Sequence, residues 1–130
     1  MELDKELIAR KRLEQIEMEK EECSSIRKQL AQMEEEFSDQ NKRIKAVNDE
    51  LFERYPGNSK LQNILLQKEE GLRQKRILEN HMLEDCRDEI SHRMQELEKE
   101  KDMIEEDLRK GEEQNENNNN VRAAAGWTSL

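Results

Sequence analysis

The chain has 130 residues, enough for one domain, and 42% of them are charged while 32% are apolar and 3% are aromatic. This mixture is too polar to fill a globular core of ordinary thickness, but it suits a long two-helix structure, which needs only a narrow apolar stripe. The formal net charge is −9. Binding a phosphate backbone requires a basic surface, so nucleic acid is not an expected partner.

The sequence also bears on membranes and export. It contains no run of about 18 apolar residues, so it predicts no membrane span. Its first ten residues, MELDKELIAR, lack the apolar core of a signal peptide. We therefore expect a protein that stays in the cytoplasm or is exported without a cleaved signal peptide.

Residues 2–54 are predicted to form one helix. One row of residues recurs every seven positions and comprises Ile16, Cys23, Leu30, Phe37, Ile44 and Leu51. A second row lies three positions after the first and comprises Ile26, Met33, Gln40 and Val47. Two rows with this spacing are the a and d positions of a coiled coil, which we call the seam. The polar Gln40 is either a partly exposed seam residue or a buried group that fixes the register.

Residues 55–59, Tyr-Pro-Gly-Asn-Ser, are predicted to form a turn. Pro56 disfavours helical backbone at Tyr55 and lacks the amide hydrogen that a helix needs. Gly57 permits a positive φ, and Asn58 or Ser59 can cap a following helix.

Residues 60–110 are predicted to form the second helix. Its seam comprises Leu61, Leu65, Leu72, Leu78, Met82, Cys86, Ile90, Met94 and Leu97. Reversal of the chain at Pro56 places Leu51 opposite Leu61 and Leu30 opposite Met82, so apolar residues meet apolar residues. The expected fold is therefore all-α, an antiparallel two-helix coiled-coil hairpin over residues 1–111. Residues 112–130 begin with the polar run EEQNENNNN and are predicted to be a disordered tail.

Several apolar residues fall off the predicted seam and are candidates for binding a partner. These are Leu7, Leu13, Leu66, Ile77 and Leu83. A single hairpin does not cover them, so we expect contact with another helical protein or with a second copy in a homodimer.

No motif for catalysis or for cofactor binding is visible, so the expected protein is not an enzyme and has no cofactor. His81 and His92 have no further His or Cys at helical spacing that would complete a metal site. Cys23 and Cys86 lie on the two seams, and two interpretations stay open. They are either small apolar seam residues in a reducing compartment or the two halves of a disulfide that locks the hairpin.

The segment from Leu51 to Leu108 carries a family resemblance, mainly in NSKLQNILLQKEEGL and DEISHRMQELEKEKDMIEEDL. It resembles the LXG-associated α-helical proteins, cytoplasmic partners of LXG toxins in type VII secretion of Gram-positive bacteria. This resemblance implies an adaptor or targeting chaperone that binds the helical N-terminal domain of a secreted effector and delivers it for export. A second resemblance is to the coiled-coil stalk proteins of flagellar and type III export. The alternative function is a structural or scaffold coiled coil that self-associates.

Overall fold

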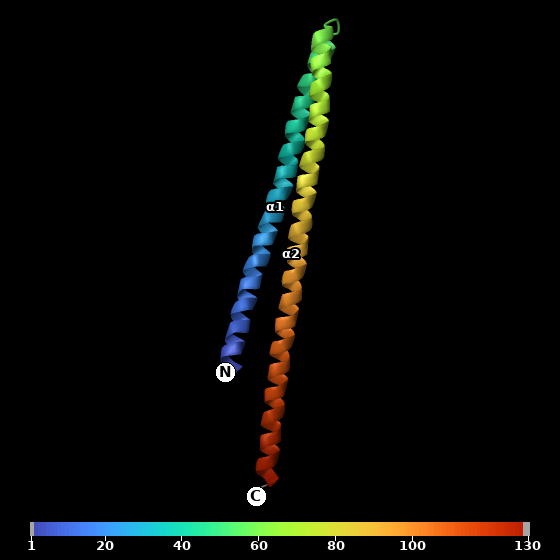
Figure 1. Cartoon of the computed structure of the whole chain (residues 1–130). Helices are drawn as coiled ribbons and strands as arrows, with labels where there is room; N and C mark the ends of the chain where they lie inside the picture. Colours follow the sequence, from blue (N-terminus) through green and yellow to red (C-terminus); the bar gives the residue numbers. More distant parts are fainter. Residues whose placement is uncertain (1, 129–130) are drawn as a thin grey trace. The chain divides into compact units, whose positions relative to one another are not determined.

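A computed structural model of the chain describes the backbone of residues 2–128 and the side chains of residues 3–114. Within that part the chain forms two helices, α1 (Glu2–Arg54) and α2 (Ser59–Thr128), and no strand. Figure 1 shows the two helices running in opposite directions on either side of one short turn. The prediction of an all-α two-helix hairpin is therefore confirmed.

Helix α1 extends without a break because its 53 residues contain neither Gly nor Pro. Ion pairs between side chains four residues apart support it locally, such as Arg10 with Glu6 at 2.9 Å and Arg54 with Glu50 at 3.2 Å. Each exposed pair of this kind adds only a few tenths of a kcal/mol, roughly 0.3–0.5. The length of the helix therefore depends mainly on its packing against α2.

The turn between the helices is held by a helix cap. The side-chain Oδ1 of Asn58 accepts a hydrogen bond from the backbone amide of Leu61 at 3.1 Å, as an N-cap residue does. The side chain of Gln62 donates to the backbone carbonyls of Phe52 and Tyr55, each at 3.2 Å, and so ties the start of α2 to the end of α1. No described residue, Gly57 included, has a positive φ, so the reversal does not use left-handed backbone.

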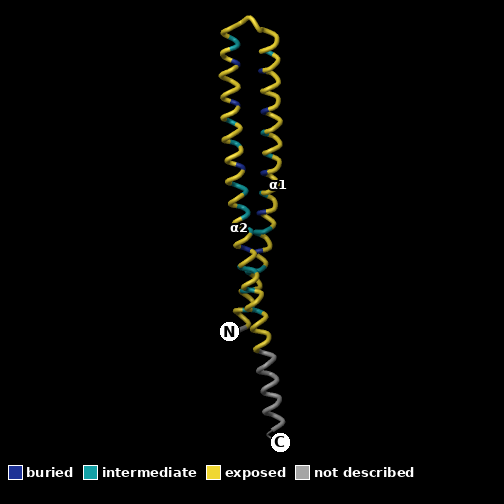
Figure 2. The backbone as a smooth tube through the Cα atoms, turned by 90° about the vertical axis from the view of Figure 1, so that its right-hand side faces the viewer, coloured by how far each residue is buried: buried dark blue, intermediate teal, exposed yellow. Residues whose placement is uncertain are grey.

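The chain divides into two compact units. We call Ser24–Ser91 the turn unit, and we call Met1–Cys23 together with His92–Leu130 the terminal unit. In each unit, a segment of α1 packs against a segment of α2. Figure 2 shows buried positions at intervals along both helices of the turn unit.

The two units have different cores. In the terminal unit, Ile16 and Leu97 are completely buried and Cys23 is 5% exposed. In the turn unit, the buried apolar residues are Leu30, Leu65, Leu72 and Leu83. Two polar residues, Asn41 and Asn48, are buried with them. The core of the turn unit is therefore partly polar.

The predicted seam needs correction in the turn unit. Six of its members are buried: Ile16, Cys23, Leu30, Leu65, Leu72 and Leu97. Eight are half-buried: Ile26, Met33, Phe37, Leu51, Leu61, Cys86, Ile90 and Met94. Four are exposed instead: Ile44, Val47, Leu78 and Met82.

The correction has a geometric cause. An α-helix with 3.6 residues per turn drifts by about 20° per heptad against a strict seven-residue row. In α1 the buried positions therefore step from Leu30 to Asn41 and then to Asn48, which leaves Ile44 and Val47 exposed.

The end of α2 also differs from the prediction. We expected the helix to end at residue 110 and residues 112–130 to be disordered, but α2 continues to Thr128. The sequence after Gly111 contains no Pro, and Gly111 itself has no positive φ, so nothing there stops the helix. A glycine inside a helix costs only about 1 kcal/mol relative to alanine.

Candidate partner-binding surfaces

The described residues contain no group of three or more His, Cys, Asp or Glu side chains placed to hold a metal ion. His81 is exposed, and His92 lies 3.0 Å from Glu96 on the same helix. The thiols of Cys23 and Cys86 are both free. No described helix is long and apolar enough to cross a membrane. The candidate sites of the described residues are therefore surfaces suited to contact with other proteins.

In the terminal unit, ion pairs between α1 and α2 set the register. Arg12 donates two hydrogen bonds to the carboxylate of Glu100, at 2.7 and 2.8 Å. The hydrogen bond from Arg12 lowers the pKa of Glu100 below its usual value. Three further pairs join the helices of this unit: Lys20 with Glu98, Arg93 with Glu19, and Lys101 with Glu17. Charge pairs therefore flank the apolar contacts of Ile16 and Leu97 between the two helices.

The turn unit has a polar cluster where the terminal unit has apolar contacts. The Asn41 side chain donates to Glu79 at 3.2 Å, and Lys75 donates to the Asn41 side-chain oxygen, also at 3.2 Å. Two buried polar atoms have no hydrogen-bond partner, Nδ2 of Asn48 and Oε2 of Glu79. A buried polar atom without a partner costs about 1–3 kcal/mol. The buried polar groups between the two helices of the turn unit therefore lack some of their hydrogen bonds, which lowers the stability of this helix pair.

A groove runs along one side of the turn unit. It consists of two adjoining hollows of about 460 and 390 Å³, and both are lined by Arg73 and Arg76. The first hollow is also lined by Glu34, Phe37, Ser38, Asn41, Ile77, Glu79, Asn80 and Leu83. The second is also lined by Lys45, Leu66, Glu69, Glu70 and Leu72. We call the two hollows together the turn-unit groove.

The groove combines apolar walls with charged side chains of both signs. Leu66 and Ile77 are 53% and 48% exposed, so each has apolar surface left to bury. Arg73 pairs with Glu70 at 3.0 Å on the surface of α2. Arg76 and Lys45 form no ion pair with the side chains that the structure describes. Four carboxylates also line the groove: Glu34, Glu69, Glu70 and Glu79. A groove of this composition suits an amphipathic helix that carries charges of both signs.

The five predicted partner-binding residues lie in three different places: the turn-unit groove, the core and the terminal unit. Leu66 and Ile77 come together as lining of the turn-unit groove. Leu83 reaches the same groove but is 2% exposed, so it belongs to the core, and its prediction as an off-seam residue is corrected. Leu7 and Leu13 belong to the terminal unit, where Leu7 is 53% exposed and Leu13 is half-buried.

The sequence prediction overlooked the basic side chains of the groove. The signal that would have found Arg73 is its spacing, because it lies seven residues after Leu66 and four before Ile77, on the same helix stripe. Lys45 comes from α1, and its place beside Leu66 requires knowledge of how the two helices pack.

A third hollow, of about 380 Å³, lies in the terminal unit. Small residues at Ala9 and Gly111 leave space there beside Ile104 and Leu108.

A scan against protein-family models found no match to the chain. A search of curated proteins and a search of solved structures found no match either.

Proposed function

We propose that the protein is a non-catalytic helical adaptor whose turn-unit groove binds an amphipathic helix of another polypeptide. The observation that carries this proposal is the exposure of Leu66 and Ile77 in a groove that also contains Arg73 and Arg76. Leu66 and Ile77 are eleven residues apart, which is about three helical turns or roughly 16 Å. A bound helix would thus meet two apolar contacts with cations between them.

The resemblance to LXG-associated proteins gives this adaptor a specific partner. In that form of the proposal, the groove binds the helical N-terminal domain of a secreted LXG effector, and the complex is delivered to a type VII secretion system. The apolar contacts would supply affinity, and the charged side chains of both signs would select a helix with complementary charges at matching positions.

The experiment is co-purification of the full chain with the N-terminal domain of an LXG effector from the same genome. The test variant combines Leu66→Ser with Ile77→Ser. The matched control combines Val47→Ser with Leu78→Ser, which removes two apolar side chains that are 56% and 70% exposed and do not line the groove. Circular dichroism checks that both variants keep their helix content.

We expect the wild type and the control to capture the effector domain and the groove variant to lose most of its capture. Failure of the wild type to capture the domain would remove the effector from the proposal. Equal capture by the wild type and the groove variant would show that binding uses another surface.

A further inference from the structure

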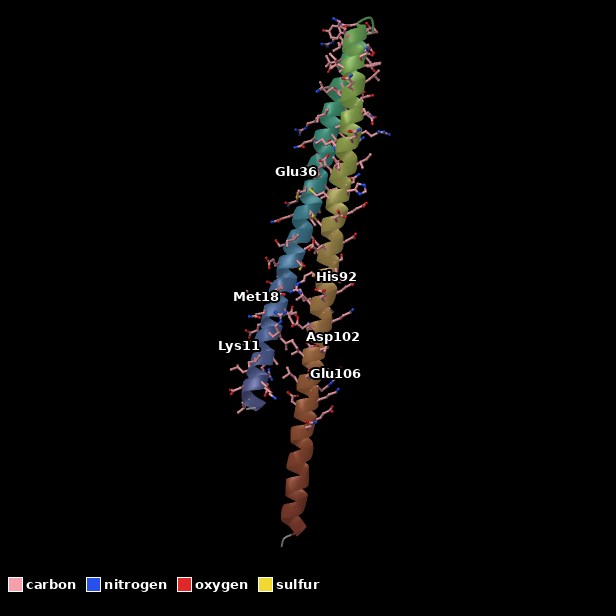
Figure 3. All side chains as sticks on the ribbon, in the orientation of Figure 1. Lys11, Met18, Glu36, His92, Asp102 and Glu106 are labelled. Carbon is pink, nitrogen blue, oxygen red and sulfur yellow. The ribbon has the colours of Figure 1, made fainter. Side chains whose placement is uncertain are left out.

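The outer face of α1 in the terminal unit carries uncovered apolar side chains. Leu7 and Met18 are 53% and 69% exposed, and Glu14 between them is exposed as well. Ile16 is completely buried against α2, and Glu14 and Met18 lie two positions before and after it, on the opposite side of the helix. Figure 3 shows Met18 and the neighbouring Lys11 projecting outward from α1. We call Leu7, Glu14 and Met18 the outer ridge.

The outer ridge has the same spacing as the exposed wall of the turn-unit groove. Leu7 is followed by Glu14 after seven residues and by Met18 after four more. Leu66 is followed by Arg73 and then by Ile77 at the same intervals. Each set forms one stripe, because eleven residues are almost three whole turns of an α-helix. The two stripes match in length and in the order apolar, charged, apolar.

The central charges of the two stripes are opposite. If the ridge lies parallel to α2 with Leu7 beside Leu66, then Glu14 lies beside Arg73 and Met18 lies beside Ile77. The carboxylate of Glu14 and the guanidinium of Arg73 would attract each other as neighbours. The two flanking apolar pairs would remove apolar surface from water.

The neighbouring charges select the direction of this pairing. In the parallel arrangement, the basic pair Arg10 and Lys11 lies beside the acidic pair Glu69 and Glu70. In the reverse direction, with Leu7 beside Ile77, Lys11 would lie beside Arg73. Glu14 would then lie beside Glu70, so two like-charged contacts would replace two opposite ones. Like charges across an interface oppose association, so the parallel arrangement is favoured.

We propose that, in the absence of another partner, the turn-unit groove holds the outer ridge of a second copy of this chain. The inference rests on the proposed function, because it uses the same groove as a helix-binding site. The pairing is reciprocal, so two copies related by a two-fold axis each place a ridge in the other's groove.

The test is a charge swap measured by sedimentation velocity over a concentration series. Glu14→Arg and Arg73→Glu each create like-charged contacts in both halves of the dimer. Each variant alone should weaken dimerisation by about tenfold or more. An equimolar mixture should dimerise as well as the wild type, because one contact keeps its native charges and the other has both charges exchanged. Asp102→Arg is the control, since it changes the net charge equally from an exposed position on α2.

Three results would overturn the inference. The first is a wild type that stays monomeric throughout the series. The second is a dimer that either single variant leaves intact, and the third is a mixture that fails to recover. The proposed adaptor function is judged separately, by the loss of effector capture in the Leu66→Ser and Ile77→Ser variant. An effector domain would displace the ridge of the second copy from the groove, so capture remains measurable whether or not the free protein dimerises.

Discussion

The position of α2 against α1 in the turn unit can be tested at two leucines that the heptad pattern and the structure place differently. The heptad pattern puts Leu78 in the seam and Leu83 outside it. In the structure Leu83 is 2% exposed and Leu78 is 70% exposed. Leu83→Ala and Leu78→Ala make the same chemical change, so the difference between their effects reports the helix face that meets α1.

The expected magnitudes follow from burial. Truncation of a buried leucine to alanine costs about 2–5 kcal/mol, with the lower values where the surroundings can relax into the space. A seam between two helices relaxes readily, so Leu83→Ala should lower the free energy of unfolding by about 2–3 kcal/mol. Full burial of a leucine contributes about 2 kcal/mol, and less than a third of Leu78 is covered. Leu78→Ala should therefore cost about 0.5 kcal/mol.

Urea unfolding followed by circular dichroism measures both effects at one protein concentration. The midpoint of the Leu83→Ala transition should fall with little change in slope, because the surface exposed on unfolding stays similar. Equal losses for the two variants, or a larger loss for Leu78→Ala, would contradict the placement of the helices and return Leu78 to the seam.

Three further predictions concern single side chains. Gly71→Ala should raise the free energy of unfolding in urea by about 0.5–1 kcal/mol, because an added Cβ has nothing within 4 Å and glycine disfavours a helix interior. Asn48→Leu should raise it by about 1 kcal/mol or more, because it replaces a buried side chain whose Nδ2 has no partner; a loss would indicate that the amide is satisfied. Arg12→Gln should raise the lowered pKa of Glu100 towards its ordinary value of 4.5, as measured by NMR titration of the carboxyl carbon. Since the folded pKa is lowered, the pair stabilises the wild type above pH 4.5 and its contribution disappears as the pH falls through the folded value.

The helices and the turn between them could be predicted from the sequence because local signals determine them. The predicted first helix, residues 2–54, coincides with Glu2–Arg54, and α2 begins at Ser59, one residue before the prediction. Pro56 and the cap at Asn58 act within a few residues, so no tertiary information is needed to place them. The far end of α2 lacks such a signal; the composition of the polar run predicts an end at residue 110, whereas α2 continues to Thr128.

Which face of each helix is buried was harder to predict from the sequence, because it depends on how the two helices pack against each other. In the terminal unit, Ile16 and Leu97 are both buried as predicted, and ion pairs between the two helices flank them. In the turn unit, the strict heptad would bury Ile44 and Val47, but the straight helix presents Asn41 and Asn48 instead. A rule that favours apolar residues cannot anticipate this, because it never selects an asparagine over a nearby isoleucine.

The groove required information from both helices. Leu66 and Ile77 were identified as uncovered apolar residues, and their exposure agrees with that interpretation. Their place beside Lys45 follows only from the packing of α1 against α2. Short-range spacing on one helix can therefore suggest a binding stripe, whereas the charge that it presents to a partner depends on the fold.

Folding and association should be linked in this protein, which leads to a last prediction. The turn unit buries Asn41 and Asn48 and leaves Ile44 and Val47 exposed, so its helix pair is weakly stabilised by its own contacts. A partner that binds only the folded hairpin stabilises it by mass action. Where the protein is mostly dimeric, each tenfold rise in concentration should add about 1.4 kcal/mol per dimer. For a dimer of two such chains, which unfold together, the melting temperature should then rise by about 2–4 °C per tenfold. Thermal melts followed by circular dichroism should show this rise in the wild type and little change in Glu14→Arg. A wild-type melting temperature that is independent of concentration would show that the hairpin is stable without a second copy.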